Sequence, residues 1–464
     1  MSLSTPSEPN QSKTGDSPNR NPERRTAVVC TLILLVLLVV MTVLEVRSML
    51  SFPRMDFGIY YDAAMALRTG GDLFGAYEQA PLTYIYPPLL AILFIPFTYL
   101  PIDVAGAIWV VINLGLLLAC LWLGGRLFLD RFNARLDVAT MPVLLLLSVI
   151  YFQPRIDAEF DQGQVDFLVL LGIFGGLAVV HRFPFLAGVI LGLVANIKYQ
   201  TVIFLPYFMI RGWWTGAVGF VSGAIAFALS GALVIGWATN LEYLKRAFAG
   251  LGSLLGLPEA EGPKPFIFPM DWSESISFTS TIARWTNVSE DGQAMTFVFV
   301  LVIGILCALV GWGLYASQGI PLFSGRGGTS GRTSHDQRSL VMLEWIGLMI
   351  AALAFAPQTK MRHLVLLLPL VMVGVLMLIV PRQGVRRMPL LITMIILFLV
   401  LVMPPPIDEA WREARKWFRR EGIPMLCILI MYFVVLWTSL KAYRGGFLSG
   451  RAIRSQNPTA GSWE

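Results

Sequence analysis

The sequence is poor in charge. Only 14% of its 464 residues are Asp, Glu, Lys or Arg, whereas 56% are hydrophobic. Soluble globular domains carry roughly 25% charged residues, so this chain lacks the polar surface that a water-soluble fold needs. The surplus of apolar side chains must face lipid, because a soluble core of this length could not bury it. The sequence therefore predicts an integral membrane protein.

Cysteine is scarce and never clustered. The four cysteines stand singly inside apolar runs, at Cys30, Cys120, Cys307 and Cys427. No two of them have metal-ligand spacing, so we expect neither a zinc site nor a disulfide framework. Their expected role is that of small apolar packing residues. An internal repeat is also missing, and with it the inverted-repeat pattern of secondary transporters.

The net charge of +6 does not form a single basic patch. The basic residues lie in short clusters between apolar runs, which is the distribution that marks cytoplasmic loops in a membrane protein. We therefore expect the lipid bilayer, and no nucleic acid, as a partner. Residues 1–25 are rich in Ser, Pro, Asn and charge, which is typical of a disordered cytoplasmic tail.

A first membrane helix is predicted from Thr26 to about Val46. Roughly 20 apolar residues are enough to cross the hydrocarbon core. Charged residues follow this run where a cleaved signal peptide would have small ones, so we expect the helix to be retained. Arg24 and Arg25 precede the helix and place the N-terminus in the cytoplasm.

Further apolar runs define the rest of a membrane domain that covers residues 26–441. They lie at 88–100, 103–125, 139–152, 164–180, 184–210, 213–238, 294–316, 340–356, 363–381, 388–404 and 424–440. The run 88–100 covers roughly 20 Å, short of a hydrocarbon core of about 30 Å, so we expect it to be re-entrant or interfacial. The run 184–210 has basic residues on both sides and is predicted to be a short hairpin that bends near Asn196-Ile197-Lys198.

These assignments predict an all-α polytopic membrane protein with roughly ten to twelve transmembrane helices. The loops that face away from the cytoplasm are then 51–87, 153–163, 239–293, 357–362 and 405–423. Residues 442–464 form a second cytoplasmic tail. The acidic residues of loop 153–163 match no recognised cation-ligand spacing, so we expect a solvated loop and no metal site there. Loop 405–423 carries five basic residues against four acidic ones.

Candidate catalytic groups begin in loop 51–87. Asp56 follows the first span by a few residues, where a carboxylate at the membrane surface can accept a proton from a hydroxyl. The alternative is a solvated aspartate that caps a helix. Tyr84 and Tyr86 lie at the start of the run 88–100, and tyrosines at such positions also anchor a segment at the membrane interface.

Cationic groups lie on distant segments. Lys198 stands between two apolar half-runs, where a cation is costly and usually functional, with a phosphate as its natural partner. The alternative is a lysine that snorkels to the interface. Lys360, Arg362 and His363 form a compact group at the start of another span, suited either to a lipid-linked phosphate or to a snorkelling collar. All of them reach the same membrane face as Asp56.

Two sets of residues carry a resemblance to a known family. The first set is Asp56, Tyr60, Ala63-Ala64, Gly70, Tyr77, Tyr84-Ile85-Tyr86-Pro87-Pro88, Pro96 and Leu100-Pro101. The second is Gly163-Gln164-Val165-Asp166, Gly188-Val189-Ile190-Leu191-Gly192, Lys198, Pro357, His363 and Pro369. Over about residues 27–440 the chain resembles glycosyltransferase family 87, which includes polyprenyl-phosphate-mannose-dependent mannosyltransferases of actinobacterial cell envelopes.

The resemblance implies a C-type glycosyltransferase fold with juxtamembrane helices in the first outer loop. Loop 51–87 is then the catalytic loop, and Asp56 matches the catalytic aspartate. Lys198 and His363 match family positions near the donor phosphate, to which Arg362 and Lys360 would add charge. The residues expected to line the substrate groove are Tyr60, Tyr84, Tyr86, Gln164 and Asp166.

The sequence departs from the family pattern at three places. The family usually has Asn where Asp166 stands, and often has Pro where Tyr199 stands. Ser and Trp are common in the family where this chain has Gln358-Thr359-Lys360. These departures bear on which sugar and which acceptor the protein uses.

The expected function is transfer of a sugar, mannose or another hexose, from a polyprenyl-phosphate carrier to an envelope glycolipid or glycan. The reaction would invert the sugar, need no cofactor, and take place on the extracytoplasmic face of the plasma membrane. Loop 239–293, rich in Pro, Phe and Trp, could cap the groove and bind the acceptor. Two alternatives stay open: a lipid or glycan flippase, whose polar groups would lie near the midplane, and a polysaccharide ligase that uses a pyrophosphate-linked donor.

Overall fold

A computed structural model describes residues 20–51, 55–75, 84–132, 138–253, 268–286, 290–323, 335–380, 387–402 and 409–444. Within these ranges all regular structure is helical. In chain order the elements are α1 (Arg20–Ser51), α2 (Met55–Thr69), α3 (Pro88–Phe94), η1 (Ile95–Tyr99), α4 (Ile102–Arg131), α5 (Thr140–Gln162), α6 (Asp166–Val179), α7 (Pro184–Ala195), η2 (Tyr199–Ile203), α8 (Phe204–Ile210), α9 (Trp214–Ser230), α10 (Ala232–Ile235), α11 (Trp237–Ser253), α12 (Phe278–Thr286), α13 (Glu290–Ser317), α14 (His335–Ala354), η3 (Met361–Leu367), α15 (Leu368–Ile379), α16 (Arg387–Val402), α17 (Glu409–Arg420) and α18 (Ile423–Arg444).

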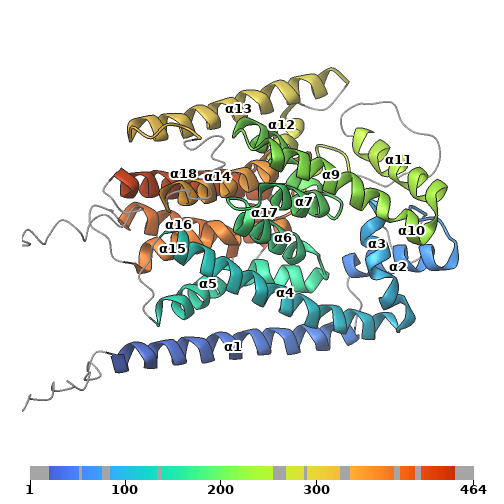
Figure 1. Ribbon diagram of the computed structural model, residues 1–464, viewed down its shortest axis with the longest axis horizontal. Helices are drawn as coiled ribbons and strands as arrows, with labels where there is room; N and C mark the ends of the chain where they lie inside the picture. Colours follow the sequence, from blue (N-terminus) through green and yellow to red (C-terminus); the bar gives the residue numbers. More distant parts are fainter. Residues whose placement is uncertain are drawn as a thin grey trace, which may run out of the picture.

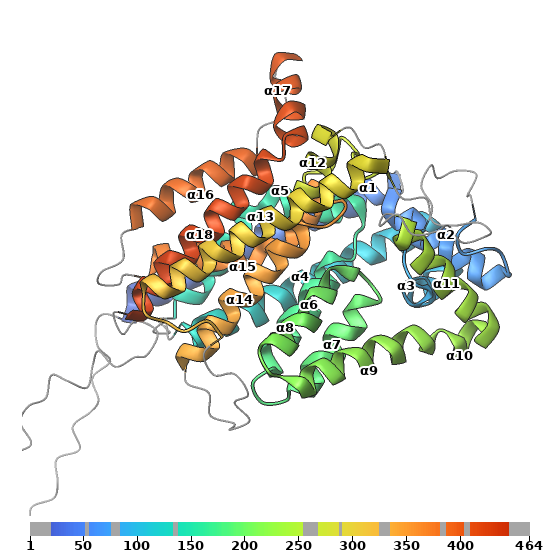
Figure 2. The same cartoon turned by 90° about the horizontal axis from the view of Figure 1, so that it is seen from above.

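The long helices form one elongated bundle. Helix α1 runs along one side of it and α13 along the opposite side, while α2, α3, α10 and α11 gather at the end where α1 finishes (Figure 1). The centre is η3 followed by α15, in which every residue from Leu368 to Met377 is buried. Helix α17 projects from the bundle next to α12 (Figure 2). The arrangement confirms the predicted all-α membrane architecture.

Eight described helices or helix pairs are long and apolar enough to cross a membrane. They are α1, α4, α5, α9 with α10, α13, α14, η3 with α15, and α18. The apolar segments 88–99, 166–179, 184–195, 199–210 and 387–400 are shorter. The segment 88–99 forms α3 and η1, which is consistent with a run that does not cross. A total of ten to twelve spans therefore depends on how the shorter helices sit in the bilayer.

The predicted hairpin at 184–210 is present and is held by close helix packing. Helix α7 ends at Ala195, and Lys198 is extended before η2 and α8 lead the chain back. A Cβ atom at Gly188 would lie 2.0 Å from the Gly216 carbonyl oxygen, and one at Gly192 would lie 2.4 Å from the Phe220 carbonyl oxygen. Because these contacts advance together along both chains, α7 and α9 are parallel, which requires the return through α8.

Three predicted boundaries were wrong. The stretch 153–163 is not a solvated loop, because α5 continues through Pro154 to Gln162 and buries Ile156 and Phe160 on its inner face. Most of loop 405–423 is helical, as α17 and the start of α18. Helix α1 begins at Arg20, before the predicted Thr26. Most of the proposed N-terminal tail, residues 1–19, lies outside the described residues. The same holds for residues 445–464.

Candidate functional site

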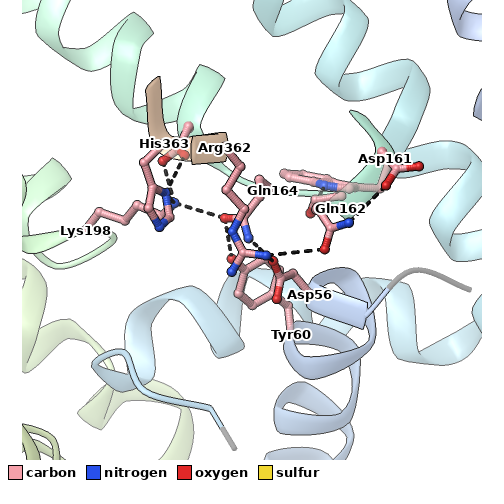
Figure 3. Close-up of polar contacts among 11 residues, drawn as sticks. Asp56, Tyr60, Asp161, Gln162, Gln164, Lys198, Arg362 and His363 are labelled. Atoms are coloured by element: carbon pink, nitrogen blue, oxygen red, sulfur yellow. Dashed lines mark hydrogen bonds and ion pairs between the residues drawn. The ribbon is translucent and has the colours of Figure 1, made fainter. Parts of the chain in front are cut away.

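Asp56 lies in the first turn of α2, at the end of the bundle where α1 finishes. Its side chain is only 4% exposed, which rules out a solvated capping residue. The carboxylate forms an ion pair with Arg362 from η3 and accepts a hydrogen bond from the Gln164 side-chain amide. Figure 3 shows these three side chains meeting from three separate elements.

Gln164 is placed by a turn that only glycine fits. Helix α5 ends at Gly163, whose φ is +64°, and a Cβ atom there would lie 2.7 Å from the Cβ of Phe57. The next residue, Gln164, turns its amide into the centre of the cluster. The amide oxygen accepts hydrogen bonds from the Tyr60 hydroxyl at 3.1 Å and from Lys198 Nζ at 2.9 Å. Gln164 thereby connects Asp56 to the second ion pair of the site.

That second ion pair joins Lys198 and Asp166, both at most 1% exposed. Lys198 Nζ lies 2.5 Å from Asp166 Oδ1, so the lysine does not snorkel to the interface. His363 Nδ1 lies 3.1 Å from Asp166 Oδ2 and 3.4 Å from Lys198 Nζ. Since a carboxylate oxygen only accepts, the His363 tautomer that fits carries its proton on Nδ1.

Glu159 is a member of the cluster that the sequence analysis placed in a solvated loop. Its side chain is fully buried, and Oε1 accepts a hydrogen bond from the Asp166 backbone nitrogen at 2.6 Å. The signal that could have found it is helical periodicity, because the buried Phe152, Ile156 and Phe160 continue the apolar face of α5 past Pro154.

Lys360 stands at the rim of the site. Its Nζ lies 4.4 Å from the ring centre of Trp272 and 5.1 Å from that of Phe268, two rings that stack at 4.1 Å. Burial, and then the neighbouring Arg362, lower the pKa of Lys360 to about 8. Burial also raises the pKa of the Tyr60 hydroxyl well above its usual value, so Tyr60 stays protonated and donates to Gln164.

The charged groups surround a cavity of about 110 Å³. Predicted residues that line it are Asp56, Tyr60, Tyr86, Gln164, Lys360, Arg362 and His363. Asp166 and Lys198 lie behind these lining residues. Residues that the sequence analysis did not place in the groove are Ile59, Ile85, Tyr199, Gln200, Phe268 and Gln358. Phe268 supports a capping role for the described part of loop 239–293.

Tyr84 has a different place from the one expected. It is fully buried and is not among the residues that line the cavity. Its hydroxyl donates to the Pro87 carbonyl at 2.7 Å and accepts from the Ala91 backbone nitrogen at 3.1 Å. Tyr84 therefore fixes the start of α3, and with it the neighbouring Tyr86.

A larger apolar cavity of about 390 Å³ adjoins the first. The two share Ile85, Tyr86, Tyr199 and Gln358 in their walls. The rest of the larger wall is mainly aliphatic and aromatic, and its residues are Pro87, Ala195, Asn196, Ile197, Val202, Phe220, Ala224, Ile225, Ala228, Leu229, Ala247 and Phe248. A polar site thus continues directly into an apolar groove.

No metal centre is apparent in the described part of the chain, where no three His, Cys, Asp or Glu side chains are grouped to hold an ion. The chemistry available at the cavity is that of one carboxylate on α2 and several cations, with an amide between them. Such a set can accept a proton and neutralise an anion at the same place.

Comparison with known proteins also indicates a glycosyltransferase. The sequence model of glycosyltransferase family 87 matches residues 84–324, more than half of the chain. No solved structure matches the chain.

Curated relatives are all named as mannosyltransferases. A polyprenol-phosphate-mannose-dependent alpha-(1-2)-phosphatidylinositol mannoside mannosyltransferase of Mycobacterium tuberculosis is 30% identical over 205 residues, which cover 41% of this chain and 47% of the relative. The Mycolicibacterium smegmatis protein of the same name is 23% identical over 300 residues, 56% of this chain and 66% of the relative. A phosphatidylinositol pentamannoside mannosyltransferase of M. smegmatis is 27% identical over 229 residues, 48% of this chain and 52% of the relative. The chain thus spans about half to two thirds of the length of these relatives.

Proposed function

The chain belongs to glycosyltransferase family 87, and we propose that it transfers mannose or another hexose from a polyprenyl-phosphate carrier to an envelope glycolipid or glycan. The observation that carries the proposal is a single cavity lined by the Asp56 carboxylate, by the cations Lys360 and Arg362, and by the His363 imidazole. A base and a phosphate site are the two requirements of this reaction. The names of the relatives support the donor.

The proposed reaction is one displacement at the anomeric carbon. The acceptor oxygen bonds to that carbon as the carbon–oxygen bond to the phosphate breaks. Asp56 takes the acceptor hydroxyl proton, and the polyprenyl phosphate leaves with the electron pair. Arg362 and Lys360 in the cavity wall would neutralise the charge on the leaving phosphate, with Lys198 adding positive charge from behind the wall, so no general acid and no cofactor is required. A single displacement inverts the sugar.

Arg362 has two partners in this scheme. Without donor its guanidinium pairs with Asp56, which holds the carboxylate away from an acceptor hydroxyl. A donor phosphate at the cavity would compete for Arg362, because guanidinium groups bind phosphates well. Donor binding would then release the base. The order of binding that follows is donor first and acceptor second.

The apolar cavity is the proposed place of the polyprenyl chain. It opens between η2, α9 and α11, where Val202 and Ile225 are about half exposed and would face lipid. Because Tyr86 and Tyr199 belong to both cavities, a phosphate in the polar one would have its isoprenoid tail in the apolar one. The polysaccharide ligase alternative uses a pyrophosphate-linked donor, whose headgroup is one phosphate longer than that of the proposed donor.

We also propose the location that the charge distribution predicts. The protein would be a multi-pass protein of the plasma membrane with a cytoplasmic N-terminus, and its cavity would face the extracytoplasmic side. The cluster lies at the end of the bundle where α1 finishes, which is the end opposite the start of α1 (Figure 1). A flippase would carry such groups near the midplane.

The test is donor turnover by purified protein in lipid nanodiscs. We expect wild-type protein to release polyprenyl phosphate from the mannose donor only with acceptor present. Asp56→Asn, which keeps the hydrogen-bonding shape, should lower kcat by about 10²–10⁴-fold, the usual loss when a general base is removed. Asp56→Glu should retain measurable turnover.

Two results would overturn the proposal. The first is full activity of a folded Asp56→Asn protein. The second is turnover of the pyrophosphate-linked donor in place of the monophosphate, which would favour the ligase. Donor movement across a sealed vesicle without glycosyl transfer would instead support the flippase.

A further inference from the structure

One polar side chain in the wall of the polar cavity has a buried atom without a partner. Gln200 lies in η2, lines this cavity and is only 8% exposed. Its amide oxygen Oε1 is buried and has no hydrogen-bond partner among the described residues. Buried carbonyl oxygens are nearly always hydrogen-bonded in folded proteins, because an unpaired one costs free energy. The unpaired oxygen of Gln200 is therefore a feature that a bound ligand could explain.

The other deeply buried polar groups of this wall are paired within the protein. Asp56 forms its ion pair with Arg362, and the Tyr60 hydroxyl donates to Gln164 Oε1. Gln164 also uses its amide nitrogen, which donates to Asp56. The side chains of Asp56, Tyr60 and Gln164 are at most 4% exposed. Gln164 and Gln200 thus differ, because the first amide serves the protein and the oxygen of the second stays unpaired in the described chain.

The segment that carries Gln200 is held on both sides. Lys198, two residues earlier, forms the buried ion pair with Asp166 at 2.5 Å. Thr201, the next residue, is fully buried and donates through Oγ1 to the Leu191 carbonyl at 3.2 Å. Because the residues before and after it are anchored, the backbone at Gln200 is fixed and its amide stays at the cavity.

Gln200 faces the headgroup end of the proposed carrier site. Tyr199, directly before it, belongs to the walls of both cavities, whereas Gln200 lines only the polar one of the two. With the isoprenoid tail in the apolar cavity, the part of the donor beside Gln200 is either the phosphate or the sugar that is bonded to it.

The chemistry of the amide selects the sugar. A carbonyl oxygen only accepts hydrogen bonds, so Oε1 needs a donor. The phosphate of the proposed carrier is an ionised diester, which offers acceptor oxygens and no hydrogen. The hydroxyl groups of the hexose are the hydrogen-bond donors that the carrier brings. Because the amide nitrogen carries two N–H donors, one glutamine can accept from one hydroxyl and donate to its neighbour on the ring.

We propose that Gln200 binds the transferred hexose through two neighbouring hydroxyl groups and thereby determines the sugar specificity. The amide oxygen accepts a hydrogen bond from one hydroxyl, and the amide nitrogen donates to the next. The inference rests on the proposed glycosyl transfer and adds the recognition of the sugar to it. A sugar without one hydroxyl of the pair would leave the buried amide incompletely paired and would bind more weakly.

The experiment measures donor binding to purified protein in phosphatidylcholine nanodiscs without acceptor. The ligands are polyprenyl-phosphate mannose and a series of donors in which one sugar hydroxyl at a time is replaced by hydrogen. We expect at least one deoxy donor to have a Kd about tenfold higher than the mannose donor for wild-type protein, the effect of one lost hydrogen bond. Gln200→Met, which keeps the length of the side chain, should raise the Kd of the mannose donor about tenfold. It should leave the Kd of that deoxy donor near its wild-type value, as expected of a coupled pair.

A second measurement separates ligand binding from a structural role. Without donor, Gln200→Met should have the same Tm as wild type or a higher one, because it removes an unpaired buried amide. The matched control is Gln164→Met, which removes an amide that bonds to Tyr60 and Lys198 and should lower the Tm. A Tm for Gln200→Met as low as that of Gln164→Met would assign Gln200 to the stability of the fold and would overturn the inference.

The binding data distinguish the remaining explanations. If Gln200→Met weakens every donor of the series by the same factor, the amide binds a part of the donor other than these hydroxyls, and the inference is wrong while glycosyl transfer stands. Equal Kd values of the wild-type protein for all donors would have the same consequence. A folded wild-type protein that binds no polyprenyl-phosphate mannose would instead count against the proposed function, and the inference would fall with it.

Discussion

Lys360 is the cation of the site whose charge is expected to change in an ordinary pH range. Its pKa is lowered to about 8 by burial and by Arg362. The ammonium is therefore charged at pH 7 and mostly neutral at pH 9, and a bound phosphate would favour the charged form. The contribution of Lys360 to donor binding is present below pH 8 and is lost as the pH rises through it.

We predict that the KM for the donor rises about tenfold between pH 7 and pH 9, because one pH unit above the pKa only about a tenth of Lys360 stays charged. The value of kcat should change less. Lys360→Arg, which stays charged, should flatten this rise, and Lys360→Gln should have a high KM throughout. A donor KM of the wild-type protein that is constant over this range would contradict the assignment.

Single residues were predictable where their position alone is informative. Asp56 and Lys198 stood out because charge at a membrane boundary or inside a span is costly and needs a reason. The Asp56–Arg362 ion pair could not be predicted, since it joins segments far apart in the chain. Glu159 was missed because it stands among several acidic residues after the apolar run 139–152, a composition that favoured a solvated loop. Tyr84 was misplaced because buried, anchoring and lining tyrosines look alike in sequence.

At the scale of elements, the packing of α7 against α9 positions Lys198. Both helices carry glycines where they touch, so their backbones approach closely. Lys198 follows directly from the end of α7, and residues of α9 line the apolar cavity. Separation of these two helices would disturb the ammonium position and the groove together.

We predict that Gly188→Ala destabilises the protein although alanine is the better helix former. The new Cβ atom would lie 2.0 Å from the Gly216 carbonyl oxygen, and backbone cannot move aside as a side chain can. Overpacking of this kind costs about 1–3 kcal/mol, against a propensity gain of about 1 kcal/mol.

The measurement is the Tm of the protein in detergent by thermal unfolding. Gly115→Ala on α4 is the control, because a Cβ atom there meets nothing within 4 Å. It should leave the Tm unchanged or raise it slightly. An unchanged Tm for Gly188→Ala would show that α7 and α9 are not in this close contact.

Helices made of long apolar runs were predictable from the sequence, with prolines marking some of their ends. Helices without such runs were not. The hairpin at 184–210 and the short segment at 88–99 were recovered because length and flanking charge define them. Helix α17 was taken for a loop because the prediction relied on continuous apolar runs. This helix is amphipathic and has few apolar residues, so it contains no such run.

The whole molecule has polar groups at two ends. The cavity lies at one end, and Arg211, Glu344 and Tyr207 form a second buried group toward the other, with Arg211 Nη1 3.0 Å from Glu344 Oε2 and the Tyr207 hydroxyl 2.5 Å from the same oxygen. Helix α13 connects the ends: Thr296 near its start contacts Thr286 of α12 at 3.0 Å, and Tyr315 near its finish faces Glu344.

This arrangement predicts which introduced cysteines can be labelled from outside the cell and which only from the cytoplasm. Trp237, at the start of α11, is 61% exposed, and Ser317, at the end of α13, is also exposed. In a background without the native cysteines, Trp237→Cys should react with a membrane-impermeant maleimide in intact cells. Ser317→Cys should react only after permeabilisation. The reverse pattern would place the cavity on the cytoplasmic side.

The cations and the carboxylate of the site stand on very different supports. Arg362 and His363 begin the segment at the centre of the bundle, whereas Asp56 stands on a short helix at one end of the bundle, which packs mainly against α3 and η1. The half that would hold the carrier is therefore difficult to alter without disturbing the interior. Relatives that use new acceptors could therefore arise by substitutions around α2 at the end of the bundle, without substitutions in its central segment.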